Sequence, residues 1–246
     1  MDGTVTHATA TGRRGAQEDR CAVVRLETGW ALAVIDGHGG SGAAQAAADA
    51  FEDAIRNSLE RGGGGEATVR DTIAALYHVT ADFTDGASAT VACVDEGAGR
   101  LAVAVLGDSP AIVREASGQM VIGPIHNTFF APEDAAAAQA RGAVRVGPYL
   151  CDERTGEGVN LTRTIGDAKL TFLGRDPDTF SAELGPGSFV LVASDGIFTA
   201  SASTPDALAE RMGRLVGGGG DAGLVVYDAL ACESDDNVTA VVWRAP

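Results

Sequence analysis

Acidic residues recur where the apolar runs of this sequence end. The run from Ala31 to Ile35 is followed by Asp-Gly-His-Gly-Gly, which places Asp36 and His38 directly after a predicted strand. Carboxylates in similar positions are Glu18, Asp19, Asp108, Asp167, Asp195, Asp235 and Asp236. One Asp before Gly is explained by a β-turn, in which the carboxylate accepts a backbone hydrogen bond. Several carboxylates together raise one another's pKa unless a cation neutralises them, and all-oxygen sites suit Mg²⁺ or Mn²⁺. The pattern raises the hypothesis of a metal cluster.

Two neighbours of Asp36 fit this hypothesis. Gly37 lets the backbone approach closely enough for its carbonyl to act as an oxygen ligand. His38 is better placed as an acid than as a ligand. A phosphate-binding loop is the other interpretation of the glycines, but no Lys-Ser/Thr follows them, so this is not a Walker loop. The remaining histidines are interpreted as structural: His7, His78 and His126.

The elements that must position these groups are short strands and amphipathic helices. Strands are expected at 5–10, 21–26, 30–35, 88–94, 101–106, 111–115, 189–194 and 238–243. Connections of three to six residues predict antiparallel hairpins between the second and third, the fourth and fifth, and the fifth and sixth of these runs. Such tight connections exclude βαβ crossovers.

Helical patterns fill the gaps between the groups of strands. They cover 41–60, 66–83, 132–142, 204–217 and 222–234. In the first two, Leu59 and Val79 belong to the apolar stripes that we expect to be buried. Strands grouped with helices beside them predict an α+β domain whose antiparallel sheets are covered by helices.

Composition narrows the classes of function. The 246 residues include 18 Lys and Arg against 34 Asp and Glu, a formal net charge of −16, which disfavours binding to nucleic acid or to an anionic membrane. The four cysteines are far apart and predict neither a disulfide framework nor a zinc site. The chain start lacks the pattern of a signal peptide, and no apolar run approaches the ~20 residues that span a bilayer. We expect a cytoplasmic protein.

A series of motifs carries a family resemblance. In chain order they are RRGAQED, LAVIDGHGG, GASATVACV, LAVAVLGDSPAIV, LTRTIGDAK, FVLVASDGIF and SDDNVTAVV. Together they resemble the metal-dependent protein phosphatases of type 2C, the PPM family, from about Gly12 to Trp243. The resemblance implies a four-layer α-β-β-α sandwich, formed by residues 1–246 as one phosphatase domain.

The resemblance also implies roles for named residues. Asp36 matches the carboxylate that bridges two Mn²⁺ or Mg²⁺ ions, Asp195 and Asp236 match ligands of the first ion, and Glu18 and the Gly37 carbonyl match ligands of the second. Asp19 matches a residue that holds metal-bound water, Arg14 the phosphate clamp, and His38 the proposed general acid. Two such ions lower the pKa of a bridging water, so that hydroxide is available to attack phosphorus.

The sequence departs from the family pattern at several points. Asp108 and Asp195 match ligands of a third, weaker ion, but Thr199 stands where the family often has another Asp. Pro110 replaces the Arg of the GDSR motif, and Ile125 replaces an Asp before the His. The flap that borders the active site in the family corresponds to residues 123–160, the part that matches least. There the adjacent Phe129 and Phe130 are expected to pack the flap down rather than to contact a substrate.

The leading hypothesis is a protein serine/threonine phosphatase, an Mn/Mg-dependent hydrolase that acts as a monomer on phosphoprotein substrates. Arg14 and His38 favour it over a branch of the family that regulates anti-sigma antagonists. A phosphatase of a small phosphorylated molecule is one alternative, suggested by the altered flap. A catalytically idle member of the fold that binds or senses is another.

Overall fold

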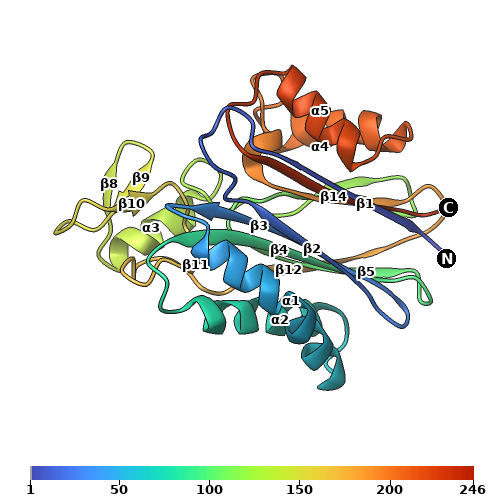
Figure 1. The fold of residues 1–246 in the computed structure, drawn as a ribbon, viewed down its shortest axis with the longest axis horizontal. Coiled ribbons are helices and arrows are strands. Elements are labelled where there is room, and N and C mark those ends of the chain that lie inside the picture. Colours follow the sequence, from blue (N-terminus) through green and yellow to red (C-terminus); the bar gives the residue numbers. More distant parts are fainter. Residues whose placement is uncertain (1) are drawn as a thin grey trace.

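The computed structural model describes residues 2–246 and consists of two packed antiparallel sheets with helices outside both (Figure 1). Helices α1 (Gly42–Glu60) and α2 (Gly65–Thr80) cover the outer face of one sheet. Helices α4 (Pro205–Gly217) and α5 (Ala222–Ala231) cover the outer face of the other. The expected α-β-β-α sandwich is confirmed.

The six-stranded sheet has the order β12-β5-β4-β3-β2 with β11 beside β4, and the five-stranded sheet has the order β1-β14-β13-β6-β7. The first comprises β2 (Arg20–Arg25), β3 (Gly29–His38), β4 (Gly86–Asp95), β5 (Arg100–Leu106), β11 (Ile165–Gly166) and β12 (Asp178–Glu183). The second comprises β1 (Thr4–Ala10), β6 (Ala111–Arg114), β7 (Met120–Ile122), β13 (Phe189–Ala193) and β14 (Val238–Arg244). Every pairing within these two sheets is antiparallel.

Both faces of the central strands are buried, which explains why their sequences are apolar without alternation. On β3, Ala33 and Ile35 pack toward α1 and α2, whereas Leu32 and Val34 point between the sheets. Side chains of a strand alternate between its two faces, so a strand covered on both sides needs apolar residues at every position. Val190 and Trp243 meet Leu32 and Val34 from the opposite sheet.

Two expectations about helix burial are wrong. Leu59 and Val79 remain exposed near the C-terminal ends of α1 and α2. The buried faces continue past Ile55 and Leu76 with polar residues, Ser58 in α1 and Thr80 in α2. Leu59 and Val79 each lie one position away from these residues and therefore face solvent.

One predicted hairpin is also wrong, and the correction bears on function. The run 107–110 does not join two neighbours in one sheet, because β5 belongs to the six-stranded sheet and β6 to the five-stranded one. Gly107 has a φ of +106°, and a Cβ at this position would lie 2.3 Å from the Cβ of Ser88. A glycine is therefore required where the chain crosses from one sheet to the other.

Residues 123–160 form a separate layer at one end of the sandwich (Figure 1). They contain α3 (Pro132–Ala140) and a small sheet with the order β10-β9-β8, formed by β8 (Val144–Val146), β9 (Tyr149–Cys151) and β10 (Gly158–Val159). The strand pattern of the sequence did not predict this small sheet, because its strands have only two or three residues. Within residues 2–246, no helix combines the length and hydropathy needed to span a bilayer.

Candidate active site

Three predicted carboxylates meet at one end of the sandwich. Asp36, Asp108 and Asp195 each offer an oxygen, and these oxygens all lie within 4.8 Å of one another. Asp36 comes from β3, Asp195 follows β13 of the opposite sheet in the 3₁₀ turn Asp195–Ile197, and Asp108 lies in the crossing between the sheets. The backbone N–H of Asp195 donates to Asp36 Oδ2 at 3.4 Å. The predicted convergence of distant acidic residues is present.

Burial raises the pKa values of these three carboxyls, and neighbouring carboxylates add to the effect. Burial raises the pKa of Asp36 well above its ordinary value, and the charge of Asp195 adds to the effect. Burial likewise raises the pKa of Asp195, with the charge of Asp108 next in importance. For Asp108, burial raises the pKa to about 6, although a hydrogen bond from Asn127 opposes the shift. The cluster is therefore costly to ionise without a neutralising cation.

The other predicted metal ligands line the same pocket, whose volume is about 810 Å³. They are Glu18, Gly37 and Asp236. The strand β3 continues through Asp36 and Gly37 to His38, three residues beyond its predicted end at Ile35. A Cβ on Gly37 would lie 2.7 Å from the carbonyl oxygen of Glu18, so the glycine allows the Glu18 segment to approach β3.

Two side chains near the pocket carry the polar groups expected for phosphate and water. Arg14 Nη2 donates to Asp236 Oδ2 at 2.5 Å, and the Arg14 side chain is 55% exposed. Asp19 is buried, and neither of its carboxylate oxygens has a hydrogen-bond partner among residues 2–246. Burial raises the pKa of Asp19 above its ordinary value, although the neighbouring Thr239 and Ser194 side chains oppose the shift. Buried carboxylate oxygens without a donor at normal hydrogen-bond geometry are rare, and they fit a site that binds water or a cation.

His38 lies in the pocket with a partner that the sequence did not assign. Its Nε2 is 2.8 Å from Asp167 Oδ2, and both residues line the cavity. Asp167 was one of the carboxylates noted after apolar runs, but neither its spacing nor the resemblance linked it to His38. Asn237 was missed as well. Its Oδ1 accepts from the Glu18 N–H at 2.8 Å, and its Nδ2 donates to Thr11 and Ala16 carbonyls, so it fixes the segment that carries Glu18.

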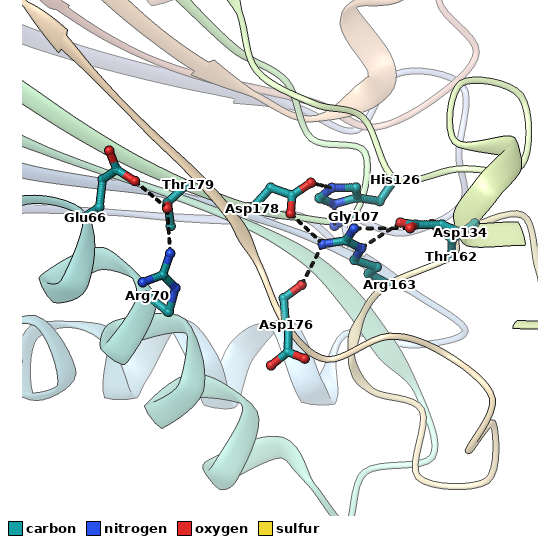
Figure 2. Close-up of polar contacts among 10 residues, drawn as sticks. All are labelled: Glu66, Arg70, Gly107, His126, Asp134, Thr162, Arg163, Asp176, Asp178 and Thr179. Carbon is teal, nitrogen blue, oxygen red and sulfur yellow. Dashed lines mark hydrogen bonds and ion pairs between the residues drawn. The ribbon is translucent and has the colours of Figure 1, made fainter. Parts of the chain in front are cut away.

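A buried histidine supports the turn that presents Asp108. His126 Nδ1 accepts from the Gly107 N–H at 3.2 Å, and the His126 N–H donates to the Gly107 carbonyl at 2.8 Å. Because Nδ1 accepts, the proton of the neutral ring is on Nε2, which donates to Asp178 Oδ2 at 3.0 Å (Figure 2). The adjacent Asn127 donates from Nδ2 to Asp108 Oδ2 at 3.3 Å. His126 is structural, as expected, and it holds the chain next to Asp108.

Arg163 links the His126–Asp178 pair to helix α3. Arg163 donates to Asp178 Oδ1 at 2.9 Å and to Asp134 Oδ2 at 2.6 Å, as Figure 2 shows. Asp134 belongs to the first turn of α3. Arg163 therefore ties α3 to β12, and through Asp178 to His126.

The departures from the family pattern have structural consequences. Ile125 is buried, and Pro110 is buried with its carbonyl accepting from the Ala193 N–H at 3.1 Å. The Thr199 hydroxyl hydrogen-bonds to Ser201 at 3.0 Å. The expectation that both aromatic residues pack the flap down is wrong for Phe129, which is 66% exposed. Phe130 is partly exposed and stacks on Phe198 with ring centroids 6.1 Å apart.

The donor set fits a hard divalent cation. The three side chains whose oxygens lie within 4.8 Å of one another are all carboxylates, which Mg²⁺ and Mn²⁺ prefer as ligands. The raised pKa values of Asp36 and Asp195 and the unpaired oxygens of Asp19 are what a site for cations requires.

Comparison with known proteins identifies the family. The family model described as Protein phosphatase 2C matches residues 16–204. The chain belongs to the protein phosphatase 2C family. Arg14 and Asp236 lie outside the matched range, but they form an ion pair in the same pocket as the matched carboxylates.

Similar proteins include curated relatives and many solved structures. The chain is 29% identical over 205 residues to Protein phosphatase 1K, mitochondrial, of Xenopus laevis, a match that covers 77% of this chain and 54% of the relative. The chain thus spans about half the length of that relative. A sex determining protein of C. elegans has the same fold, with a TM-score of 0.81, 24% identity and coverage of 98% of this chain and 64% of the other.

A third relative was solved with metal. The catalytic domain of the serine threonine protein phosphatase PstP, in complex with 2 manganese ions, aligns with a TM-score of 0.61 and 22% identity. The alignment covers 98% of this chain and 97% of PstP. At these identities the two solved structures establish that the fold is shared.

Proposed function

We propose that this protein phosphatase 2C family member is a metal-dependent phosphomonoester hydrolase that removes phosphate from phosphoserine and phosphothreonine in proteins. The observation that carries the proposal is the convergence of Asp36, Asp108 and Asp195 within 4.8 Å, in a pocket open to solvent. Family membership supports the reaction, and the manganese ions of PstP support the cofactor.

Two Mn²⁺ or Mg²⁺ ions are the proposed cofactors. Asp36, Asp195 and Asp236 would hold one, and Asp36, Glu18 and the Gly37 carbonyl the other. Asp108 and Asp195 would hold a third, weaker ion. When bound, such ions supply Lewis-acid stabilisation of charge and lower the pKa of water. Asp19 contributes a carboxylate that accepts hydrogen bonds from water in the site.

Arg14 binds the phosphate of the substrate. Its guanidinium lies at the pocket and keeps donors available beyond the one that contacts Asp236. A guanidinium holds two phosphate oxygens in a fixed fork, a geometry that Lys does not provide. The ion pair with Asp236 orients the side chain before the substrate arrives.

His38 handles the proton of the leaving group. Water supplies the oxygen of the new P–O bond, the bond from phosphorus to the serine oxygen breaks, and the electron pair goes to that oxygen. A serine alkoxide is strongly basic, so a proton from His38 stabilises it as it leaves. The products are inorganic phosphate and the free hydroxyl of serine or threonine.

The decisive experiment measures phosphate release by the purified protein after removal of metal by chelator. Phosphoserine and phosphothreonine peptides, p-nitrophenyl phosphate and a panel of phosphorylated metabolites are supplied with Mn²⁺, with Mg²⁺ or with chelator alone. Asp36→Asn is compared with Asp176→Asn, a change at an exposed carboxylate outside the pocket.

We expect metal-dependent release from the peptides by the wild type and by Asp176→Asn, and none by Asp36→Asn. Faster turnover of a metabolite than of the peptides would replace the protein substrate with a small one. Metal binding without release from any substrate would contradict the proposed hydrolase and favour a binding or sensing role.

A further inference from the structure

Asp167 is a buried carboxylate of the pocket for which neither the family pattern nor the proposed metal ligands gives a role. We propose that Asp167 is a positioning residue for His38, and that Gly86 keeps open the space in which the two side chains meet. This inference deepens the proposed function and rests on it, because the role of His38 is to give a proton to the leaving oxygen.

The contact itself has a defined direction. His38 Nε2 lies 2.8 Å from Asp167 Oδ2, and the side chain of Asp167 is 4% exposed whereas that of His38 is 25% exposed. An ionised carboxylate only accepts hydrogen bonds, so the Nε2 proton is donated to Asp167. When the His38 ring also carries a proton on Nδ1, that second proton is the one available to the leaving oxygen of the substrate.

The Asp167 carboxylate has no other recorded hydrogen bond within residues 2–246. A structural carboxylate at such depth is normally satisfied by several donors. Here the one donor is a partly exposed histidine of the pocket. The Asp167 carboxylate therefore serves to orient the His38 ring.

The backbone around Asp167 is held in an uncommon conformation. Asp167 has a φ of +48°, in the left-handed region that is uncommon for residues other than glycine, although Asp and Asn adopt it more readily than most. Its N–H donates to the Asp85 carbonyl at 3.0 Å, and its carbonyl accepts from Arg175 Nη2 at 3.1 Å. Arg175 Nη1 also donates to the Thr164 carbonyl at 2.8 Å, so one guanidinium clamps both sides of the turn. Strain of this kind persists where the surrounding structure imposes it, commonly at functional sites.

Gly86 explains how the two side chains reach one another. On β4, Gly86 is paired with His38 of β3 on one side and with Gly166 of β11 on the other. A Cβ on Gly86 would lie 2.1 Å from Asp167 Oδ2 and 2.6 Å from His38 Nε2. Any side chain at this position would occupy the place of the hydrogen bond. The absence of a side chain at Gly86 is therefore required for the hydrogen bond between His38 and Asp167.

The first test is the dependence on the leaving group. With Asp167→Asn we expect kcat for a phosphoserine peptide to fall about 10–100-fold, as for other partners of functional groups, with KM nearly unchanged. With p-nitrophenyl phosphate, whose leaving group needs no proton, kcat should change less than about 3-fold. Asp176→Asn is the matched control and should leave both rates unchanged. Equal losses on both substrates would overturn the proposal.

The second test is a double-mutant cycle. If Asp167 acts through His38, adding Asp167→Asn to His38→Ala should cause no further loss of kcat on the peptide. A loss as large as in the wild-type background would show that Asp167 acts elsewhere and would overturn the proposal. Gly86→Ala should reproduce the leaving-group pattern of Asp167→Asn.

A third measurement needs neither activity nor a stable variant. In the metal-free wild-type protein at about pH 8, long-range ¹H–¹⁵N spectra should show the His38 ring with its proton on Nε2. A proton on Nδ1 alone would overturn the proposal. Absence of phosphatase activity in the wild type would refute the proposed function instead, while the spectrum would still report whether Asp167 holds the ring.

Discussion

The protein contains two histidine–aspartate pairs. In one the histidine is the more exposed member, and in the other the aspartate is. In the pocket, the His38 side chain is 25% exposed and its partner Asp167 is 4% exposed. Beside the crossing of the sheets, the His126 side chain is 3% exposed and its partner Asp178 is 48% exposed. In both pairs Nε2 faces the carboxylate.

The second ring nitrogen separates the two roles. His126 Nδ1 accepts from the Gly107 N–H, so both nitrogens of this ring are committed to the fold. Within residues 2–246, His38 Nδ1 has no hydrogen-bond partner. A histidine whose ring is fully bonded and buried can orient a backbone, whereas one with a free nitrogen in a pocket can exchange a proton with a substrate. Variants of the two pairs should therefore differ: changes at His38 should affect kcat, and changes at His126 should affect stability.

The largest effect is expected from His38→Ala. Loss of the proton donor should lower kcat on a phosphoserine peptide by about 10²–10⁴-fold, which is the usual contribution of a general acid. The melting temperature should stay nearly unchanged, because the ring is partly exposed. Steady-state kinetics and thermal unfolding check both expectations. A large loss of stability with little loss of kcat would reverse the assigned roles.

The corresponding change at His126 should act on stability. His126→Ala leaves a cavity and removes the partner of the Gly107 N–H, so we expect the free energy of unfolding to fall by about 2–4 kcal/mol. Denaturant titration measures this change. His78→Ala, at an exposed position of α2, is the control and should change stability by less than about 0.5 kcal/mol.

The acidic centre and the His126 pair should respond to pH with opposite sign. The raised pKa of Asp108, about 6, means that the folded metal-free protein binds this proton more tightly than the unfolded chain does. Its stability therefore falls as the pH rises from about 4 through 6. Asp108→Asn should raise the metal-free stability at neutral pH by about 1–3 kcal/mol. Denaturant titrations in chelator across this pH range provide the test.

In the His126 pair the sign is reversed. Burial lowers the pKa of His126, so stability is lost as the pH falls through the ordinary range of histidine. Burial alone would raise the pKa of Asp178, but the hydrogen bonds from His126 and Arg163 outweigh it and keep that pKa below its ordinary value. His126→Gln should flatten the acid side of the stability profile and leave the neutral side unchanged.

Excess Mn²⁺ should restore the stability that the metal-free protein loses at neutral pH through the raised pKa of Asp108, because the cation binds the folded state. A neutral side that does not respond to Mn²⁺ would contradict the metal site.

The smallest effect is expected from Asp178→Asn. This residue accepts from both His126 and Arg163, but it is half exposed, and exposed pairs contribute little. The free energy of unfolding should fall by about 0.5–1 kcal/mol, with kcat unchanged. A loss of kcat comparable to that of Asp167→Asn would show that the two pairs are functionally alike.

Much of the fold follows from local pattern. The apolar runs predicted eight strands of the two main sheets within a few residues, and helical spacing located all five α-helices. The short strands of 144–159 escaped prediction, as did β7, β11 and β12 of the two main sheets. The strands of 144–159, β7 and β11 have only two or three residues each. Asp178–Glu183 contains only two apolar residues, Phe180 and Ala182, so its alternation is too short to predict a strand. The crossing at 107–110 was predicted as a hairpin because loop length does not reveal which sheet the next strand joins.

The sequence by itself determined which residue types are available for chemistry. The carboxylates at strand ends, the glycine after Asp36 and the pocket histidine could be predicted because apolar runs stop where a buried strand reaches solvent. The tertiary structure decided which of them touch. Asp167 meets His38 across Gly86, and Asp108 joins Asp36 and Asp195 because the chain changes sheets at Gly107. Contacts of this kind depend on register and on the packing of two sheets, and neither is encoded in the spacing of residues along one strand.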